Sequence, residues 1–425
     1  ELTFTKLIED VHTNQFQLED LAQGFRDIEQ SNTAFNNLFE DIDLYARKLG
    51  SSPQKQNETI SNVMKGLAGI NLGAHDGDVL GDAYEYLIGQ FASDSGKNAG
   101  EFYTPQPVSS LMTKIVLQGK EKQKGFTVYD PTMGSGSLML NVKKETEEPE
   151  TIRYFGQEIN TSTYNLARMN MMLHNVPIAN QNLNNGDTLA DDWPVDEPTN
   201  FDAVLMNPPY SAKWSAAKGF LDDPRFMDYG VLAPKSRADF AFLLHGFYHL
   251  KSSGTMAIVL PHGVLFRGGA EAKIRQTLLE NGHIYAVIGL PANIFFNTSI
   301  PTTIIVLKKD YTKRDVLFID ASERFTKKGN QNTMEPHHIM EILEAYQKRE
   351  FIDKFAYLAD FEEIKENEFN LNIPRYVDTF EPEPEIPLVD LANEIAGIET
   401  ELAATKSELL AMLEQLTATD SGTEK

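Results

Sequence analysis

The tetrapeptide Asn207-Pro208-Pro209-Tyr210 combines residue types that can hold and activate an amino group. It follows the apolar run 203–206, which the sequence predicts to be a buried strand. Prolines stop a strand and fix the backbone, so the Asn207 side-chain oxygen and the Pro208 carbonyl can point into one cleft. These two acceptors would bind both hydrogens of an amino group while Tyr210 stacks on the attached ring. A polar turn after a strand is the alternative interpretation.

The chemistry expected of this pattern is methyl transfer to a planar amino group. A conjugated amine is a poor nucleophile because its lone pair is delocalised into the ring. Two acceptors in a dry site favour the geometry in which that lone pair points at an incoming methyl group. We therefore predict that Asn207, Pro208, Pro209 and Tyr210 are the catalytic residues.

A glycine-rich segment upstream is predicted to connect a strand to a helix. It reads Asp130-Pro131-Thr132-Met133-Gly134-Ser135-Gly136 and follows the apolar run 126–129. Its glycines let the backbone approach a ligand, and its serines can cap exposed amides. A plain tight turn and a phosphate cradle at a helix N-terminus are the alternatives. Two carboxylates that follow favour a nucleoside: Glu158, after the next strand, suits a ribose diol, and Asp187 can accept from an exocyclic amine. Together they suit an adenosine without a phosphate tail.

The composition excludes several classes of protein. The chain has no cysteine, so it has no disulfide and no thiol nucleophile, which excludes a cysteine-dependent cytosine mechanism and fits a cytoplasmic location. Its nine histidines show no metal-binding spacing, and we expect no metal. With 41% hydrophobic residues and no long apolar run, it is expected to be soluble and globular. The formal charge of −24 opposes phosphate binding, so either the chain does not bind DNA or a partner supplies the basic surface. Because the sequence opens on Glu1, we expect part of the N-terminus to be missing.

The elements that would position these residues change along the chain. Residues 1–98 are predicted to be helical, with an amphipathic helix at 79–91 and apolar positions at Phe35, Leu38, Phe39, Ile42, Leu44 and Leu49. After residue 100, short apolar strands alternate with helical stretches, and we expect strands at 126–129, 152–155, 203–206, 256–260, 285–290 and 303–307. This alternation predicts an α/β domain with a mostly parallel sheet, which binds ligands at the carboxyl ends of its strands.

Two further segments predict contacts with macromolecules. Residues 211–237 are the most basic stretch near the expected cleft, with Lys213, Lys218, Arg225 and Arg237. Lys213, Lys218 and Arg237 are our candidates for DNA contact, and a solvated surface loop is the alternative. In the tail, apolar residues alternate spacings of three and four across four heptads, interrupted at Thr405: Leu388, Leu391, Ile395, Ile398, Leu402, Leu409, Met412 and Leu416. They predict a coiled-coil helix, with a packed amphipathic helix as the alternative.

The order of the motifs resembles one family. The sequence Gly100-Glu101-Phe102-Tyr103-Thr104-Pro105 precedes the glycine-rich segment, Glu158, Asp187 and the Asn207 tetrapeptide, as in adenine-N6 methyltransferases. With the helical N-terminus, the segment 370–376 and the coiled-coil tail, the chain most resembles the modification subunit of type I restriction-modification systems. The resemblance implies a Rossmann-like methyltransferase domain with a mostly parallel seven-stranded sheet, and domains at 1–98, 99–378 and 379–425.

The resemblance also implies a cofactor and the residues that bind it. S-adenosylmethionine would be bound by Phe102, Tyr103, Thr104, Pro105, Asp130, Pro131, Thr132, Gly134, Ser135, Gly136, Glu158 and Asp187. Within this set, Thr104 and Pro105 would serve the methionine end. Tyr210 and Phe296 would stack on an adenine extruded from double-stranded DNA, with Phe295 the close competitor of Phe296.

The partners implied by the resemblance explain the acidic charge. They are double-stranded DNA, a specificity subunit, a second modification subunit and a restriction subunit, and the heptad seam would bind the specificity subunit. Two alternatives to this function remain open from the sequence. One is a methyltransferase that acts on RNA or on a glutamine amide, and the other is a non-enzymatic scaffold that has kept the fold.

Overall fold

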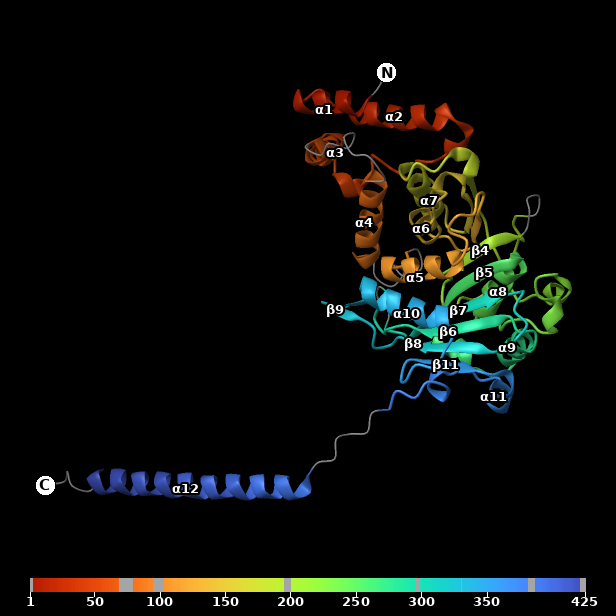
Figure 1. Cartoon of the computed structure of the whole chain (residues 1–425). Coiled ribbons are helices and arrows are strands. Elements are labelled where there is room, and N and C mark those ends of the chain that lie inside the picture. The colour runs from red at the N-terminus through yellow and green to blue at the C-terminus, as the bar shows by residue number, and fades with distance from the viewer. Residues whose placement is uncertain are drawn as a thin grey trace. The chain divides into compact units, whose positions relative to one another are not determined.

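The computed structural model describes residues 3–68, 79–94, 103–194, 200–295, 299–329, 331–380 and 387–420. The chain divides into two compact units, Glu1–Asp378 and Thr379–Lys425. The first unit contains a large mixed sheet with helices, and the second contains one long helix (Figure 1). The boundary expected near residue 98 stays a prediction.

The first unit is built on a nine-stranded sheet in the order β11-β8-β6-β7-β5-β4-β1-β2-β3. Its strands are β1 (Thr127–Asp130), β2 (Arg153–Glu158), β3 (Gln181–Asn185), β4 (Phe201–Met206), β5 (Leu250–Pro261), β6 (Ile284–Gly289), β7 (Thr302–Lys308), β8 (Val316–Asp320) and β11 (Ala356–Ala359). β7 is antiparallel to β5 and β6, β11 is antiparallel to β8, and the other pairs are parallel. The predicted α/β class and mostly parallel sheet are confirmed.

The number of strands differs from the expected seven. All six strands located from the sequence are present, but β8 and β11 extend the sheet beyond β6. The expectation of seven strands was therefore wrong, because it took no account of an extension past the last predicted strand. A separate hairpin pairs β9 (Thr326–Lys328) with β10 (Gln331–Thr333).

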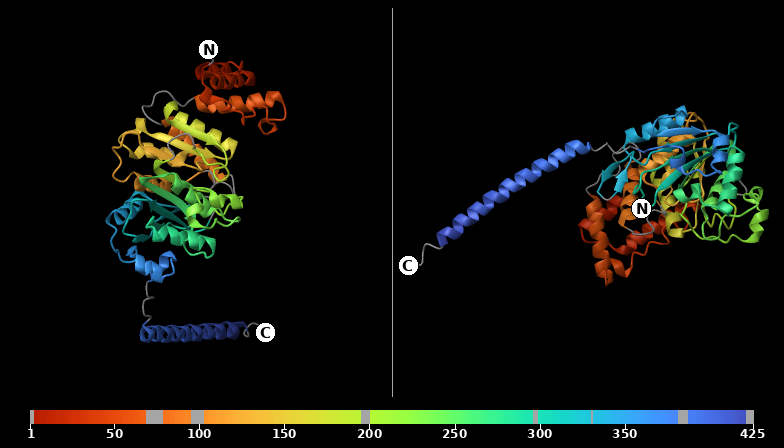
Figure 2. Two further views of the ribbon diagram at one scale, coloured as in Figure 1. Left: turned by 90° about the vertical axis from the view of Figure 1, so that its right-hand side faces the viewer. Right: turned by 90° about the horizontal axis from the view of Figure 1, so that it is seen from below.

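Helices cover both faces of this sheet (Figures 1 and 2). One core cluster combines side chains of α5 (Gln106–Leu117), α6 (Ser137–Glu145), α7 (Thr161–Leu173) and α10 (Pro336–Lys348) with Val128 and Leu205. The other combines α8 (Asp239–Tyr248), α9 (Ala270–Glu280) and α11 (Phe361–Glu366) with Tyr129 and Met206. Successive strand residues thus enter opposite cores. β4 is buried along its whole length, which explains the apolar run 203–206.

The N-terminal region is helical in part. α1 (Phe4–His12), α2 (Leu18–Ser31) and α3 (Pro53–Ala68) surround a small core of their own. α4 (Val79–Asp94) starts where the sequence predicted a helix and packs against α7.

Between α2 and α3 the helical prediction was wrong. This stretch forms only two short 3₁₀ turns, Thr33–Phe35 and Arg47–Leu49. Asparagines interrupt the helix: the Asn32 side chain accepts from the Ala34 amide, and Asn37 has a φ of 56°. Leu38 and Leu44 are buried here although they lie on turns, so their spacing reflected burial rather than a helix.

The second unit contains α12 (Leu388–Asp420), a helix of 33 residues. All eight apolar seam residues predicted from the sequence are exposed on it, from Leu388 at 75% to Leu391 at 40%. The helix is confirmed, whereas its pairing in a coiled coil stays a prediction. In the part of the chain that the structure describes, no helix is both long and apolar enough to cross a membrane.

Candidate active site

The residues expected to do chemistry lie at the carboxyl ends of four adjacent strands. β1 ends at Asp130, β2 ends at Glu158, and Asn207 directly follows β4, while Asp187 lies just beyond β3. These four strands are neighbours in the sheet and run parallel, so their carboxyl ends share one edge.

Two hollows open at this edge. The larger is a cavity of about 760 Å³, a common size for a ligand pocket. Its lining includes Pro131, Thr132, Glu158, Asp187, Pro209, Lys213, Trp214 and Phe220. The smaller hollow shares Thr132 with the cavity and is lined by Tyr103, Thr104, Asp130, Gly134, Ser135 and Asn207, among others. Of the other predicted cofactor residues, Pro105 precedes α5, Gly136 precedes α6, and Phe102 lies outside the described residues.

The glycine-rich segment is a tight turn between β1 and α6. Gly134 and Gly136 have φ angles of 53° and 78°, which side chains with a Cβ rarely adopt. The Gly134 amide donates a 3.1 Å hydrogen bond to the Glu158 carboxylate, and the Gly136 amide donates to the Met133 carbonyl. Because a carboxylate already faces the Gly134 amide, a phosphate beside it would be repelled. The turn therefore suits an uncharged ligand group better than a phosphate.

Asp130 is a carboxyl group buried at the end of β1, with 1% of its surface exposed. Its Oδ1 accepts from the Thr132 amide at 2.9 Å. Burial raises the pKa of this carboxyl to about 8, and the charge of Glu158 adds to the rise. Among the residues that the structure describes, no lysine, arginine or histidine is one of the main groups that shift this pKa. A cation bound in the smaller hollow would therefore stabilise the charged form of Asp130.

Glu158 and Asp187 both face the larger cavity. Glu158 accepts from the amides of Gly134 and Asn160, and burial raises the pKa of its carboxyl. Asp187 uses one oxygen, Oδ1, to accept from the Leu189 amide at 3.0 Å. Each carboxylate is thus held by backbone amides at a fixed place in the cavity wall.

The Asn207 carboxamide is buried, and both of its ends have partners. Its Nδ2 donates to the Thr104 hydroxyl at 3.1 Å, and its Oδ1 accepts from the Tyr210 hydroxyl at 2.9 Å. These bonds join the Thr-Pro segment to the tetrapeptide across more than a hundred residues of sequence. They also hold the plane of the amide between two hydroxyl groups.

The Tyr210 ring packs against Phe295. The two rings meet edge to face, with centroids 6.1 Å apart and an interplanar angle of 85°. Phe295 is buried with 3% exposure, whereas Phe296, the residue preferred from the sequence, lies outside the described residues. The choice between Phe295 and Phe296 as a partner of the target base therefore stays a prediction.

With this geometry in place, comparison with known proteins identifies the family. Residues 75–385 match the model of the N-6 DNA Methylase family. The chain belongs to this family. It is also 37% identical over 421 residues to the methylase subunit of the type I restriction enzyme MpnII from Mycoplasma pneumoniae, across 93% of this chain and 77% of that one.

Two other relatives agree with this placement. The HindI methylase subunit of Haemophilus influenzae is 30% identical over 81% of this chain and 79% of its own length. The crystal structure of the type I methyltransferase subunit from Streptococcus thermophilus superposes with a TM-score of 0.87 at 70% identity, covering 89% of this chain and 80% of that one. The chain is thus a modification subunit of the type I kind, an adenine-N6 DNA methyltransferase, as the motif order predicted.

The basic stretch of the methylase, residues 211–237, contains both exposed and buried side chains. Lys213, Lys218 and Arg237 are exposed, so they remain candidates for DNA contact. Trp214 and Arg225 are buried, with 7% and 3% exposure. Arg225, which the sequence analysis counted in the basic stretch but not among the DNA-contact candidates, turns its guanidinium inward to hydrogen-bond partners.

Asp239 helps to hold the tetrapeptide in place, and the sequence analysis did not predict this role. Ser211, directly after Tyr210, has a φ of 53°, and its amide donates to Asp239 Oδ1 at 2.8 Å. Asp239 is fully buried at the start of α8, and Arg267 neutralises it through a 2.9 Å ion pair. The only signal available was an acidic residue at the start of an apolar helix, which predicts a cap but not this partner.

A second support reaches the glycine-rich turn of the methylase from α4. The Asn170 side chain donates to the Ser135 carbonyl and to Glu85 of α4, both at 3.0 Å. Glu85 also accepts from Gln106 at the start of α5. An N-terminal helix thus orients a residue that holds the turn, and no local sequence pattern predicts a contact of this kind.

Proposed function

We propose that the chain transfers a methyl group from S-adenosylmethionine to N6 of an adenine extruded from duplex DNA, releasing S-adenosylhomocysteine and one proton, with Asn207 and Pro208 as acceptors for the amino group. One observation carries this assignment. The Asn207 carboxamide lines the same small hollow as Asp130 and Gly134. The group that would bind the target amine therefore borders the groups that would hold the end of the cofactor bearing the methyl group.

The residues present fit S-adenosylmethionine. The buried Asp130 carboxyl, raised in pKa, suits the ammonium group of the methionine end, beside Thr104 and Pro105. Glu158 would accept from the ribose diol, and Asp187 would use its second oxygen for the adenine amine. Phe102, Tyr103, Pro131, Thr132, Ser135 and Gly136 complete the proposed site. The cofactor supplies a methyl group already activated as a sulfonium, so the chemistry calls for no metal.

Asn207 Oδ1 has two lone pairs, and in the structure the Tyr210 hydroxyl uses one of them. The second lone pair would accept from the target amino group. Rotation of the Tyr210 ring away from Asn207 would leave both lone pairs to the amino group and turn the ring toward a base. Stacking between Tyr210 and Phe296, or Phe295, would then stabilise the extruded adenine.

The wider assembly is also part of the proposal. Lys213, Lys218 and Arg237 would contact the DNA backbone, while most of the basic surface would come from partners, because this chain carries a formal charge of −24. The exposed apolar residues of α12 would form a coiled coil with a specificity subunit. A second modification subunit and a restriction subunit complete the complex. In this scheme residues 1–98, 99–378 and 379–425 are the helical, catalytic and assembly domains.

The assignment of Asn207 is tested by Asn207→Ala in the enzyme assembled with its partner subunits. Loss of the paired acceptor should lower methyl transfer to duplex DNA by at least about 100-fold, as for other groups that act on the reacting atoms. Binding of S-adenosylhomocysteine, followed by calorimetry, should stay within about threefold of wild type because Asn207 borders the proposed cofactor-binding residues without being one of them. Activity is measured by transfer of a radiolabelled methyl group.

The matched control is Asn165→Ala. Asn165 is buried like Asn207 but lies on α7 and bonds to Asp41, outside both hollows. It should retain methyl transfer. Near wild-type transfer by Asn207→Ala would refute the assignment, and transfer to RNA or protein rather than duplex DNA would refute the proposed substrate.

A further inference from the structure

Arg225 is a buried cation inside the loop that follows the tetrapeptide. It lies between the 3₁₀ turns Lys218–Asp222 and Met227–Tyr229, with 3% of its surface exposed. Its Nε and Nη2 form a two-pronged ion pair with Asp223, at 3.0 and 2.8 Å. The guanidinium also lies 4.9 Å from the ring centre of Phe226. These contacts fix the guanidinium within the loop and direct its remaining donors into the protein.

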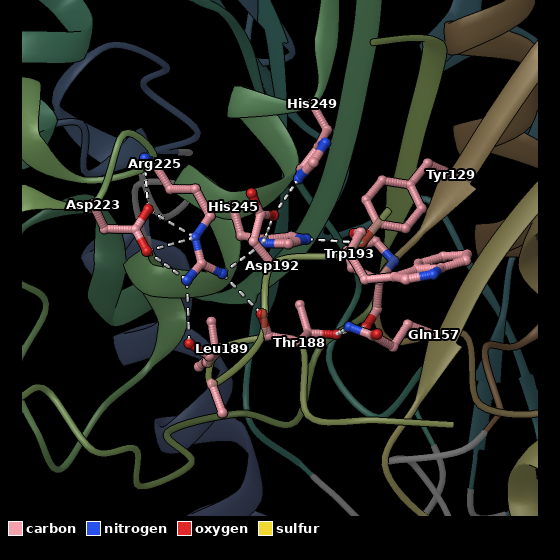
Figure 3. A network of polar contacts seen from close by, with 12 residues as sticks. Tyr129, Gln157, Thr188, Leu189, Asp192, Trp193, Asp223, Arg225, His245 and His249 are labelled. Carbon is pink, nitrogen blue, oxygen red and sulfur yellow. Dashed lines mark hydrogen bonds and ion pairs between the residues drawn. The ribbon is translucent and has the colours of Figure 1, made fainter. Parts of the chain in front are cut away.

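Those remaining donors bind the segment that carries Asp187. Arg225 Nη1 donates to the Thr188 carbonyl at 2.9 Å, and Nη2 reaches the Leu189 carbonyl at 3.4 Å (Figure 3). Thr188 in turn bridges two other parts of the site. Its hydroxyl donates to the Pro131 carbonyl of the glycine-rich segment at 2.5 Å and accepts from Gln157 of β2 at 2.7 Å.

A third group around Arg225 is a cluster of Asp192, His245 and His249, whose ligand atoms lie within 4.8 Å of one another. The hydrogen-bond pattern argues against a metal there. The Tyr129 hydroxyl donates to the Trp193 carbonyl at 2.7 Å, so its oxygen accepts from His245 Nε2 at 2.8 Å.

His245 therefore carries its proton on Nε2, and its Nδ1 lone pair accepts from Arg225 at 3.1 Å. Neither ring nitrogen is left to coordinate a cation, and the guanidinium charge would repel one. Burial and the neighbouring charges of His249 and Arg225 lower the pKa of His245 well below its usual range, which matches a neutral imidazole. Figure 3 shows the resulting chain of contacts from Asp223 through Arg225 and His245 to Tyr129.

We infer that Arg225 is a positioning residue for the nucleoside end of the cofactor site. Arg225 joins the loop that bears Lys213 and Lys218 to the segment 187–189, so each of these two segments holds the other in place. The inference rests on the proposed function, since it assumes that the larger cavity receives the nucleoside. Phe220 and Trp214 of the same loop and Thr188 and Leu189 of the segment line this cavity together, so a break at Arg225 would loosen two of its walls at once.

The decisive variant is Arg225→Gln, compared with Arg225→Lys. The glutamine removes the charge and most of the donors, and we expect the Kd for S-adenosylhomocysteine to rise about tenfold by calorimetry on the full chain. Lysine keeps the charge but lacks the planar fork, so we expect a rise of about threefold. In the assembled enzyme, the KM for S-adenosylmethionine should rise in parallel, while kcat at saturating cofactor stays within about twofold because Asn207 and Tyr210 are untouched.

Arg275→Gln is the matched control. Arg275 is also 3% exposed and donates to the carbonyls of Val264, Arg267 and Phe369, outside the lining of either hollow. It should destabilise the fold comparably and leave the Kd within about twofold. An unchanged Kd in both Arg225 variants, or an equal rise in Arg275→Gln, would overturn the inference. Failure of the wild-type chain to bind S-adenosylhomocysteine would instead overturn the proposed function.

Discussion

The two hollows at the edge of the sheet differ in how far they are already open. The larger cavity, with Glu158 and Asp187, has a volume of about 760 Å³, and backbone amides hold both carboxylates in its wall. The smaller hollow has about 10 Å³, and its polar groups bind one another: Asn207 bonds to Thr104 and Tyr210. The larger cavity is therefore open to a ligand already, whereas the polar groups of the smaller hollow are bonded to one another.

This difference indicates an order of events at the site. A nucleoside can enter the larger cavity without breaking an internal hydrogen bond of its carboxylates. The smaller hollow, at about 10 Å³, must widen before it can hold a ligand. Under the proposed function, the nucleoside would therefore enter the larger cavity first.

The largest effect is expected from a substitution of Asp130, in the smaller hollow. Asp130→Asn removes the carboxylate that would pair with the ammonium group, and we expect the Kd for S-adenosylhomocysteine to rise about 100-fold at pH 8, since a buried charge pair loses one partner. Calorimetry on the full chain measures this. Asp202→Asn is the control, because Asp202 is buried to a similar degree but pairs with Lys251, outside the lining of either hollow. An equal loss of affinity in both variants would show that Asp130 has no special part in binding.

The raised pKa of Asp130 predicts a specific pH dependence for this comparison. Below about pH 8 the free chain holds this carboxyl neutral, whereas a cationic ligand needs it charged. The ratio of wild-type to Asp130→Asn affinity should therefore rise by up to about tenfold per pH unit between pH 6 and 8 and then level off. Taking the ratio cancels titration of the ligand itself. A flat ratio would contradict the role given to Asp130.

The raised pKa of Asp130 also determines the direction in which the stability of the fold changes with pH. Its folded value lies above the reference value of 3.8, so between about pH 4 and 8 the folded chain holds a proton that the unfolded chain has lost. This group therefore makes the free energy of unfolding fall as the pH rises through that window. Asp130→Asn should remove that part of the decline, as measured by urea unfolding of both proteins at pH 5 and pH 8.

A smaller effect is expected from Thr104→Val, which removes the hydroxyl that orients Asn207. Loss of one neutral hydrogen bond is worth about 1 kcal/mol, so kcat should fall about fivefold while the Kd for S-adenosylhomocysteine changes less. Thr113→Val is the matched control: Thr113 is also buried, and its hydroxyl has no hydrogen-bond partner among the described residues. If both variants lower kcat equally, the bond from Asn207 to Thr104 does not prepare the site.

Sequence reasoning found the parts of this site that depend on chain order. β1, β2 and β4 contain apolar runs because they are covered on both faces, and polar residues directly follow such runs. Once the strands are known to be parallel, their carboxyl ends must meet. β3 escaped detection because it is an edge strand with the sequence Gln-Asn-Leu-Asn-Asn and is only partly buried. Neither its composition nor its periodicity predicts a strand.

What the sequence could not show is how side chains far apart in the chain pair with one another. Arg225 and Lys213 are both basic residues of one loop, yet the first is buried against Thr188 and His245 and the second is exposed. Nothing in the local pattern distinguishes them, because the distinction depends on which backbone carbonyls the fold brings near. The bonds from Asp239 to Ser211 and from Glu85 to Asn170 escaped prediction for the same reason.

The smallest expected effect concerns the rim of the open cavity. Lys213→Ala and Lys218→Ala should each weaken binding of the assembled enzyme to duplex DNA about threefold, equally for specific and unrelated sequences, and lower the slope of log affinity against log salt by about one. In Lys218→Ala the affinity for S-adenosylhomocysteine should not change, because Lys218 does not line the larger cavity, whereas Lys213 does. Lys122→Ala is the control, a lysine 80% exposed that pairs only with Glu147 among the described acidic residues. An unchanged salt slope would indicate that the rim is merely solvated. A slope lowered by substitution of these lysines but not of Lys122 would show that the loop bearing Lys213 and Lys218 contacts the DNA.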